Sequence, residues 1–117
     1  MKKSLLGIIL SIFLNHQSNA GIKLEGEITE LWVNDVRVHN AAFVSVGENY
    51  QSPCNSGVQS RYIIIDLADT DPSMKNAFSM VLAAYMSGKP VTLGGTGECF
   101  PGTNNEKLKY LFFGDYN

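Results

Sequence analysis

The sequence predicts a mainly β fold with one α-helix, and three observations support this class. Short runs of β-branched and aromatic residues, separated by turn residues, occupy most of the chain. Residues 71–88 carry apolar side chains at helical spacing between a strong start and a strong stop. Two cysteines, Cys54 and Cys99, are the even number that an exported chain pairs as a disulfide. Two free thiols or a metal pair are the alternatives, although no neighbouring His or Cys would complete a metal site.

Three strands are expected before the helix. Residues 26–33 alternate between apolar and polar side chains, and residues 36–46 resume an extended run after an Asn-Asp turn signal. These two segments predict a hairpin. Residues 47–57 are rich in Gly, Asn, Ser and Pro, which predicts a loop around Cys54. Residues 61–67 are β-branched or aromatic at their centre, which predicts a strand buried on both faces.

The helix is expected to begin after Asp71 and to end at Gly88. Asp71 is a good N-cap, and Pro72 suits the first helical position, where its missing N–H has no cost. Gly88 is a C-terminal stop, and Pro90 prevents continuation. An apolar stripe predicts the buried face: Met74, Ala77, Phe78, Val81, Leu82 and Tyr85. The opposite face is uncharged, and it either packs against another copy of the chain or is buried more deeply than usual: Asn76, Met80, Ala83 and Ser87.

Two strands are expected after the helix: one begins at residues 91–93 and ends in the glycines just before Cys99, and the other covers residues 108–113, with a turn at residues 101–105 between them. The glycines of residues 94–97 are interpreted as a bend or bulge, because a phosphate-binding loop needs a Lys-Ser/Thr pair and a following helix. The resulting order, β-β-β-α-β-β, is that of the five-stranded OB barrel, whose helix lies between the third and fourth strands. The disulfide would then tie the loop before the third strand to the end of the fourth.

Residues 1–20 are expected to be a secretory signal peptide, which predicts a secreted or periplasmic protein. Lys2 and Lys3 give a positive start, residues 5–14 are mostly apolar, and residues 18–20 offer small side chains to a signal peptidase. The apolar run is about half of the ~20 residues that cross a bilayer, so a membrane anchor is the weaker interpretation.

The chain that would remain, residues 21–117, predicts a single domain of 97 residues. Without Lys2 and Lys3 it holds seven basic and eleven acidic residues, a net charge of −4. Nucleic acid is a disfavoured partner, because phosphate backbones bind clustered Lys and Arg side chains. An anionic membrane surface is disfavoured for the same reason.

The residues predict no catalytic, metal or cofactor site. His39 is the one histidine left after cleavage, and neither a Gly-x-Ser-x-Gly motif nor a free cysteine is expected to form a nucleophilic pair with it. Asp66, Asp69 and Asp71 could together hold a calcium ion, but they lack the glycine and final glutamate of an EF-hand loop. We therefore expect a protein that is not an enzyme.

Ligand contacts are expected from aromatic and polar side chains. Trp32 and the tyrosines could offer flat faces to a sugar, although packing explains each of them taken singly. Tyr50 and its neighbours Glu48, Asn49 and Gln51 are expected to be the best exposed candidates, because they lie in a polar loop where binding residues often occur.

Residues 78–91, with the sequence FSMVLAAYMSGKPV, resemble a segment of the subtilase cytotoxin B subunit and its small exported relatives. In that family, as here, a Gly-x-Pro-Val step leads from the helix into the fourth strand. Cys99 follows shortly after it in this chain. The resemblance implies an OB-fold domain that assembles into a ring of five, with helices around a central pore. It also implies binding to host-surface glycans and delivery of a separate catalytic A chain.

The same resemblance marks two candidate ligand residues where this sequence departs from the family. Glu25 precedes Gly26, where the toxin member has a sugar-contacting serine, and Phe78 stands where its helix contributes a tyrosine. A carboxylate at residue 25 would repel an acidic sugar, and a phenylalanine cannot donate a hydrogen bond. The resemblance therefore implies the fold more strongly than the ligand.

The leading hypothesis is a non-enzymatic exported binding domain that recognises a host-surface glycan or a protein and forms a homo-pentamer. The second is a solitary periplasmic or secreted OB-fold protein, an accessory or inhibitor with a protein partner. The third is a small hydrolase, which would require His39 and an acidic side chain to meet in one pocket.

Overall fold

The structure, a computed structural model of the chain, describes residues 21–33 and 40–114. The expected signal peptide at residues 1–20, the Asn-Asp turn, His39 and Tyr116 lie outside these residues, and what was inferred from them stays a prediction. In the described part of the chain, no helix is long and apolar enough to cross a membrane.

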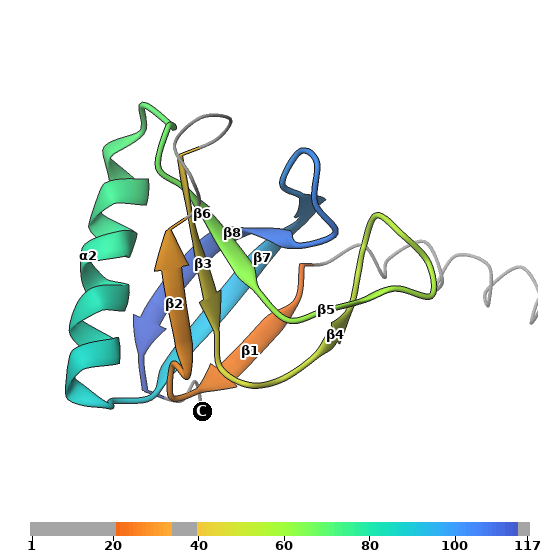
Figure 1. The fold of residues 1–117 in the computed structure, drawn as a ribbon. Helices are drawn as coiled ribbons and strands as arrows, with labels where there is room; N and C mark the ends of the chain where they lie inside the picture. The colour runs from red at the N-terminus through yellow and green to blue at the C-terminus, as the bar shows by residue number, and fades with distance from the viewer. Residues whose placement is uncertain (1–20, 34–39, 115–117) are drawn as a thin grey trace, which may run out of the picture.

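The described residues form eight strands and one helix (Figure 1). The strands before the helix are β1 (Lys23–Gly26), β2 (Glu30–Val33), β3 (Ala41–Ser45), β4 (Tyr50–Gln51), β5 (Gln59–Ser60) and β6 (Ile63–Asp66). The helix α2 (Pro72–Ser87) is followed by β7 (Val91–Cys99) and β8 (Glu106–Phe113). The predicted mainly β class with one helix is confirmed.

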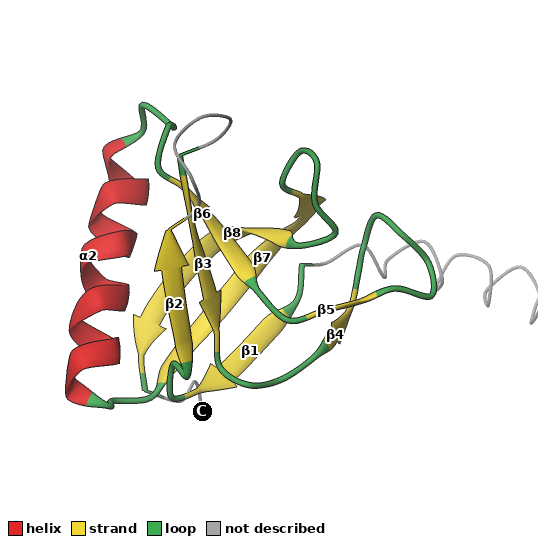
Figure 2. Ribbon diagram, in the orientation of Figure 1, coloured by secondary structure: helices red, strands yellow, loops and turns green. Residues whose placement is uncertain are grey.

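Six of the strands form one curled sheet in the order β1-β7-β8-β6-β3-β2 (Figure 2). β6 and β8 run parallel, whereas the other neighbours run antiparallel. β1 and β2 lie at opposite ends of this order, yet only residues 27–29 separate them in the chain. The sheet must therefore curl into a half-barrel, which brings its two edge strands toward each other.

The predicted strand over residues 26–33 is therefore two strands rather than one. Gly26 ends β1 with φ at 145°, a conformation that glycine adopts without steric cost. Thr29 then donates its backbone N–H to Ser45 O at 2.8 Å, next to the start of the β2–β3 ladder. The predicted hairpin is confirmed for β2 and β3, which pair antiparallel.

The main core lies between the inner face of the sheet and α2. Ile63 and Ile65 of β6 belong to it, together with Val81 and Ala84 of α2. Ile64 belongs to a second, smaller cluster on the outer face of the sheet, because successive side chains of a strand point to opposite faces. All three isoleucines are fully buried, which confirms the predicted burial of this strand on both faces.

Both predicted ends of α2 are confirmed. The Asp71 carboxylate accepts a hydrogen bond from the Ser73 N–H at 3.0 Å, and Pro72 occupies the first helical position. Gly88 adopts φ of 70° and donates its N–H to Ala84 O at 2.9 Å. Local sequence signals therefore account for where the helix starts and stops.

The predicted apolar stripe of the helix is too wide on one side. Leu82 and Tyr85 were expected to be buried, but they are 40% and 44% exposed. The fully buried positions are Val81 and Ala84, and each exposed residue follows one of them by a single step, about 100° around the helix. α2 therefore turns part of its apolar surface toward solvent.

Replacing Asp71 by alanine is expected to lower the melting temperature at pH 7, because the first helical turn loses its acceptor. The hydrogen bonds from Ser73 hold the pKa of Asp71 below its ordinary value of 3.8. With a lowered folded-state pKa, the cap stabilises the fold above the ordinary pKa, and this contribution is lost as the pH falls through the folded pKa. Thermal melts of Asp71→Ala and wild type should therefore converge in acid.

The matched control for this prediction is Asp71→Asn, which can cap a helix but does not titrate in acid. It should melt close to the wild type at pH 7. Equal melting temperatures for Asp71→Ala and wild type at pH 7 would contradict the prediction.

The bulge predicted at the glycines of β7 is confirmed. The register with β8 shifts between Gly94 and Gly95 and again between Gly95 and Cys99. These glycines also permit a close approach between the two strands. A Cβ atom on Gly94 would lie 2.0 Å from the Tyr110 ring, and one on Gly95 would lie 2.1 Å from Glu106 Oε1. A side chain at Gly94 would displace the Tyr110 ring, and one at Gly95 would displace the Glu106 carboxylate.

The predicted disulfide between Cys54 and Cys99 is confirmed. It joins the loop between β4 and β5 to the last residue of β7. The expectation that residues 47–57 form only a loop is wrong in part, because β4 pairs with β5 in a two-stranded ladder. The disulfide therefore attaches a small hairpin to the end of the main sheet.

Candidate functional site

The expectation that Tyr50 is an exposed ligand residue is wrong. Its side chain is 5% exposed and belongs to the main core. Its hydroxyl donates a hydrogen bond to Tyr62 O and accepts one from the Glu106 N–H at 2.9 Å. Burial raises the pKa of Tyr50 from 10.0 to about 12. Its neighbours Glu48 and Asn49 are exposed in the loop between β3 and β4.

Glu106 forms the other half of this buried polar network. Its side chain is 2% exposed, and its Oε1 atom accepts hydrogen bonds from the N–H groups of Ile22, at 3.0 Å, and Gly97, at 2.7 Å. The carboxylate therefore joins the beginning of the described chain to the bulge of β7 and to the start of β8. Its contacts assign it a structural role rather than a ligand contact.

Glu25 and Phe78, the two residues marked by the family resemblance, lie on different sides of the sheet. Glu25 is exposed on β1 and forms an ion pair with Lys23 Nζ at 3.1 Å. Leu24 beside it points into the main core, so Glu25 points outward. Phe78 is partly buried on α2 and packs against the main core from the inner side. The structure does not bring the two side chains into one site.

The acidic residues between β6 and α2 are used in local turns. Asp66, Asp69 and Asp71 each accept a hydrogen bond from the backbone N–H two residues further along, at 2.9 to 3.0 Å. Among residues 21–33 and 40–114, no three His, Cys, Asp or Glu side chains are grouped in a way that could hold a metal ion.

The outer face of β2 and β3, together with the residue just before β6, carries a cluster of three aromatic rings, which we call the aromatic platform: Trp32, Phe43 and Tyr62. The Trp32 indole stacks on the Phe43 ring with centroids 4.0 Å apart and planes 11° apart. Tyr62 meets both rings edge-on, at 5.7 Å from Trp32 and 5.9 Å from Phe43. Offset-stacked and edge-to-face arrangements are the ones that aromatic pairs prefer.

One side of the platform packs against the protein, and the other side is exposed to solvent. Phe43 is buried and packs in the second cluster with Ile64 and Phe100, whereas Trp32 is 42% exposed. An ion pair borders it, with Arg61 Nε 3.2 Å from Glu30 Oε2 and both side chains partly exposed. The arrangement offers a flat apolar surface next to one carboxylate and one guanidinium group.

Sequence reasoning considered Trp32 only as a single aromatic residue and did not predict this platform. The signal lies in the strand register, because Trp32 stands opposite Phe43 across β2 and β3, and Phe43 stands opposite Ile64 across β3 and β6. A predicted hairpin without its register does not show which side chains share a face.

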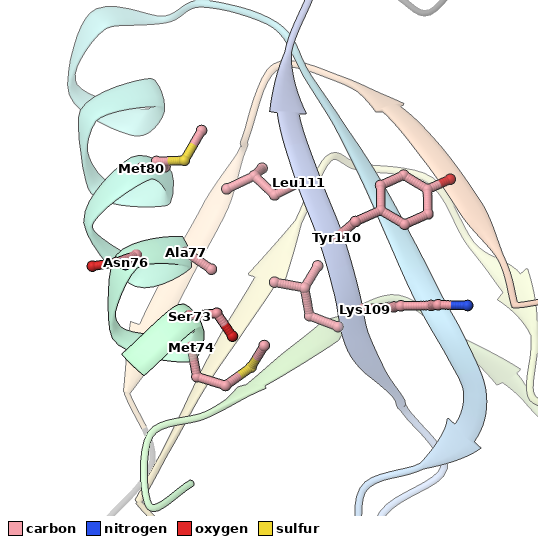
Figure 3. A pocket seen from close by; sticks show the side chains of 9 residues that line it. Ser73, Met74, Asn76, Ala77, Met80, Lys109, Tyr110 and Leu111 are labelled. Carbon is pink, nitrogen blue, oxygen red and sulfur yellow. The ribbon is translucent and has the colours of Figure 1, made fainter. Parts of the chain in front are cut away.

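A second surface follows the groove between α2 and β8, which has a volume of about 240 Å³ (Figure 3). Met74 and Met80 project from α2 toward β8, and Leu111 projects back from β8. Lys75 is the single charged residue of α2, and Met86 on the solvent side of the helix is 83% exposed. Helix and groove together form a mostly apolar surface, with Lys75 on the helix and Lys109 among the residues that line the groove.

In its described residues the protein is a disulfide-bonded β fold with one helix, an ordered aromatic patch and an apolar helix surface. Comparisons of the chain with protein-family models, curated proteins and solved structures found no match. Its function is therefore inferred from the geometry of its own residues.

Proposed function

We propose that this protein is an exported, non-enzymatic binding domain built on an OB-type barrel and that its ligand is a glycan. The strand order carries the proposal. If β1 and β2 are the two halves of one bent strand, the sheet contains five strands and closes on itself through that first strand. The helix then lies between the third and fourth strands, as in the OB fold.

The position of the aromatic platform supports a ligand-binding role. OB domains bind oligonucleotides and oligosaccharides on the face formed by their second and third strands. In this interpretation those strands are β3 and β6: Phe43 of the platform lies on β3, Tyr62 directly precedes β6, and Trp32 stands opposite Phe43 on the neighbouring β2. The net charge of −4 on residues 21–117 disfavours an oligonucleotide, which leaves an oligosaccharide as the better candidate.

The disulfide supports export. Structural disulfides form and persist in oxidising compartments such as the periplasm or the extracellular space. Cys54 and Cys99 are joined, and no free cysteine is found in the described chain. Together with the expected signal peptide at residues 1–20, this favours a secreted or periplasmic location.

The surface of α2 supports assembly of several copies. Leu82, Tyr85 and Met86 are exposed on a helix with one charged residue, and apolar surface of this kind is a common contact between copies. The resemblance to the subtilase cytotoxin B family implies that the assembly is a homo-pentamer and that a separate A chain accompanies it.

Light scattering on the oxidised chain of residues 21–117, combined with a glycan array, tests this proposal. The expected result is the mass of five chains and binding to at least one glycan. Met86→Glu, which places a charge on the helix surface, should yield a monomer, whereas Gln51→Glu, which adds the same charge at the exposed residue of β4, should leave the mass unchanged. A wild-type monomer that binds no glycan would contradict the proposal.

A second candidate function is a solitary OB-fold accessory or inhibitor protein with a protein partner. The methionines that line and flank the helix groove favour it, because flexible thioether side chains suit adaptable protein-binding surfaces. A pull-down from periplasm or culture supernatant distinguishes the two. Recovery of one other protein in fixed ratio with a monomeric chain would support the second candidate.

A further inference from the structure

We infer that the aromatic platform is a sugar subsite that takes one uncharged pyranose ring on the open face of Trp32. This assignment rests on the proposed function, because it requires a glycan ligand. It adds the residues of the site and the class of sugar, neither of which follows from the fold.

Trp32 offers one ring face to a ligand. Phe43 covers the other face, since its ring lies 4.0 Å away and nearly parallel, and Tyr62 contacts the indole edge-on. The 42% exposure of Trp32 therefore falls on the remaining face and the free edge. The face of an aromatic ring carries partial negative charge, which attracts the C–H groups on the apolar side of a pyranose.

The ring is also held in position before a ligand binds. Trp32 and Phe43 are direct partners in the β2–β3 ladder, and Phe43 packs on Ile64 and Phe100 beneath it. A side chain that is already ordered loses little conformational entropy on binding. Stacking on Trp32 therefore contributes more binding free energy than stacking on a mobile surface ring would.

The Glu30–Arg61 pair supplies hydrogen-bonding groups at the border of the platform. Glu30 lies two residues before Trp32 on the same face of β2, and Arg61 directly precedes Tyr62. The two side chains are 38% and 53% exposed, for Glu30 and Arg61 respectively, although the Oε2 atom that lies 3.2 Å from Arg61 Nε is itself buried. A sugar hydroxyl can donate to a carboxylate and accept from a guanidinium group at the same time.

The charges around the platform favour an uncharged sugar. Glu30 and Arg61 neutralise each other, while residues 21–117 as a whole carry a charge of −4. An acidic sugar would compete with Glu30 for Arg61 and would be repelled by the net charge of the domain. An uncharged pyranose neither competes with Glu30 for Arg61 nor is repelled by the net charge.

Trp32 is the single tryptophan of the chain, so intrinsic fluorescence reports directly on this site. A glycan array that pairs uncharged oligosaccharides with their sialylated counterparts, lactose and sialyllactose among them, selects the probe. We expect the uncharged member of each bound pair to give the stronger signal. Titration of the oxidised protein with the strongest uncharged oligosaccharide should shift the Trp32 emission to shorter wavelength.

Calorimetry on variants completes the test. Trp32→Ala is expected to weaken binding of the same oligosaccharide by at least about tenfold, and Trp32→Phe by less. Arg61→Ala leaves all three rings in place and should weaken binding by about threefold. Phe113→Ala, which removes a similarly exposed ring from the end of β8, should bind like the wild type.

The possible outcomes separate the assignment from the proposed function. Binding of acidic glycans alone, an unchanged Trp32 emission, or equal affinity for Trp32→Ala and wild type would overturn the assignment and leave the proposed function standing. Failure of the wild type to bind any glycan on the array would overturn the proposed function itself.

Discussion

Replacing Cys54 and Cys99 together by serine is expected to lower the free energy of unfolding by about 4 kcal/mol. The disulfide joins residues that are 45 positions apart, and closing a loop of that length restricts the unfolded chain. It also attaches the β4–β5 hairpin to the end of β7. Urea unfolding followed by the fluorescence of Trp32 measures the change as a shift of the midpoint.

The control for this prediction is the wild-type protein with its disulfide reduced. It should unfold at about the same urea concentration as the double serine variant, because both lack the same cross-link. An unchanged midpoint for the double variant would show that the cross-link does not stabilise the fold.

Replacing Glu106 by alanine is expected to lower the free energy of unfolding by about 3 kcal/mol. Hydrogen bonds to a charged group contribute about 1.5–3 kcal/mol each, and donors that lose their acceptor inside the fold keep their desolvation cost. Glu106 Oε1 accepts from the N–H groups of Ile22 and Gly97, and both would lose their acceptor. Urea unfolding measures the loss, and faster hydrogen exchange at these two amides would locate it.

Two variants make the Glu106 result interpretable. Glu106→Gln keeps an acceptor oxygen in place and should lose less stability than Glu106→Ala. Glu98→Ala removes an exposed carboxylate from the same hairpin, where its 3.7 Å contact with Lys107 is worth about 0–1 kcal/mol. Equal losses for Glu98→Ala and Glu106→Ala would contradict the structural role of Glu106.

Local patterns were sufficient to predict most of the elements. The ends of α2 follow from Asp71, Pro72 and Gly88, whose effects are confined to neighbouring residues. The buried β6 follows from its run of isoleucines, and the disulfide follows from an even cysteine count. These predictions succeeded because each depends on side chains close in sequence or on a single possible pairing.

The division of the first strand and the identity of the exposed residues could not be predicted in this way. Tyr50 lies among polar neighbours, but its hydroxyl has partners 12 and 56 residues away, at Tyr62 and Glu106. The aromatic platform depends on the register between β2 and β3, which a single sequence does not determine. Glu25 and Phe78 were selected by resemblance, which does not specify the side of the sheet.

The position of Glu106 has a consequence for the order in which the chain can fold. β1, near the beginning of the described chain, pairs with β7, and Ile22 before it is held by a side chain of β8. A ribosome makes β7 and β8 long after β1, so β1 lacks its partner strand while the residues between them are being synthesised. The first strand therefore reaches its native pairing only after β7 and the start of β8 have been made, and a chain that stops before residue 106 would leave Ile22 without its acceptor.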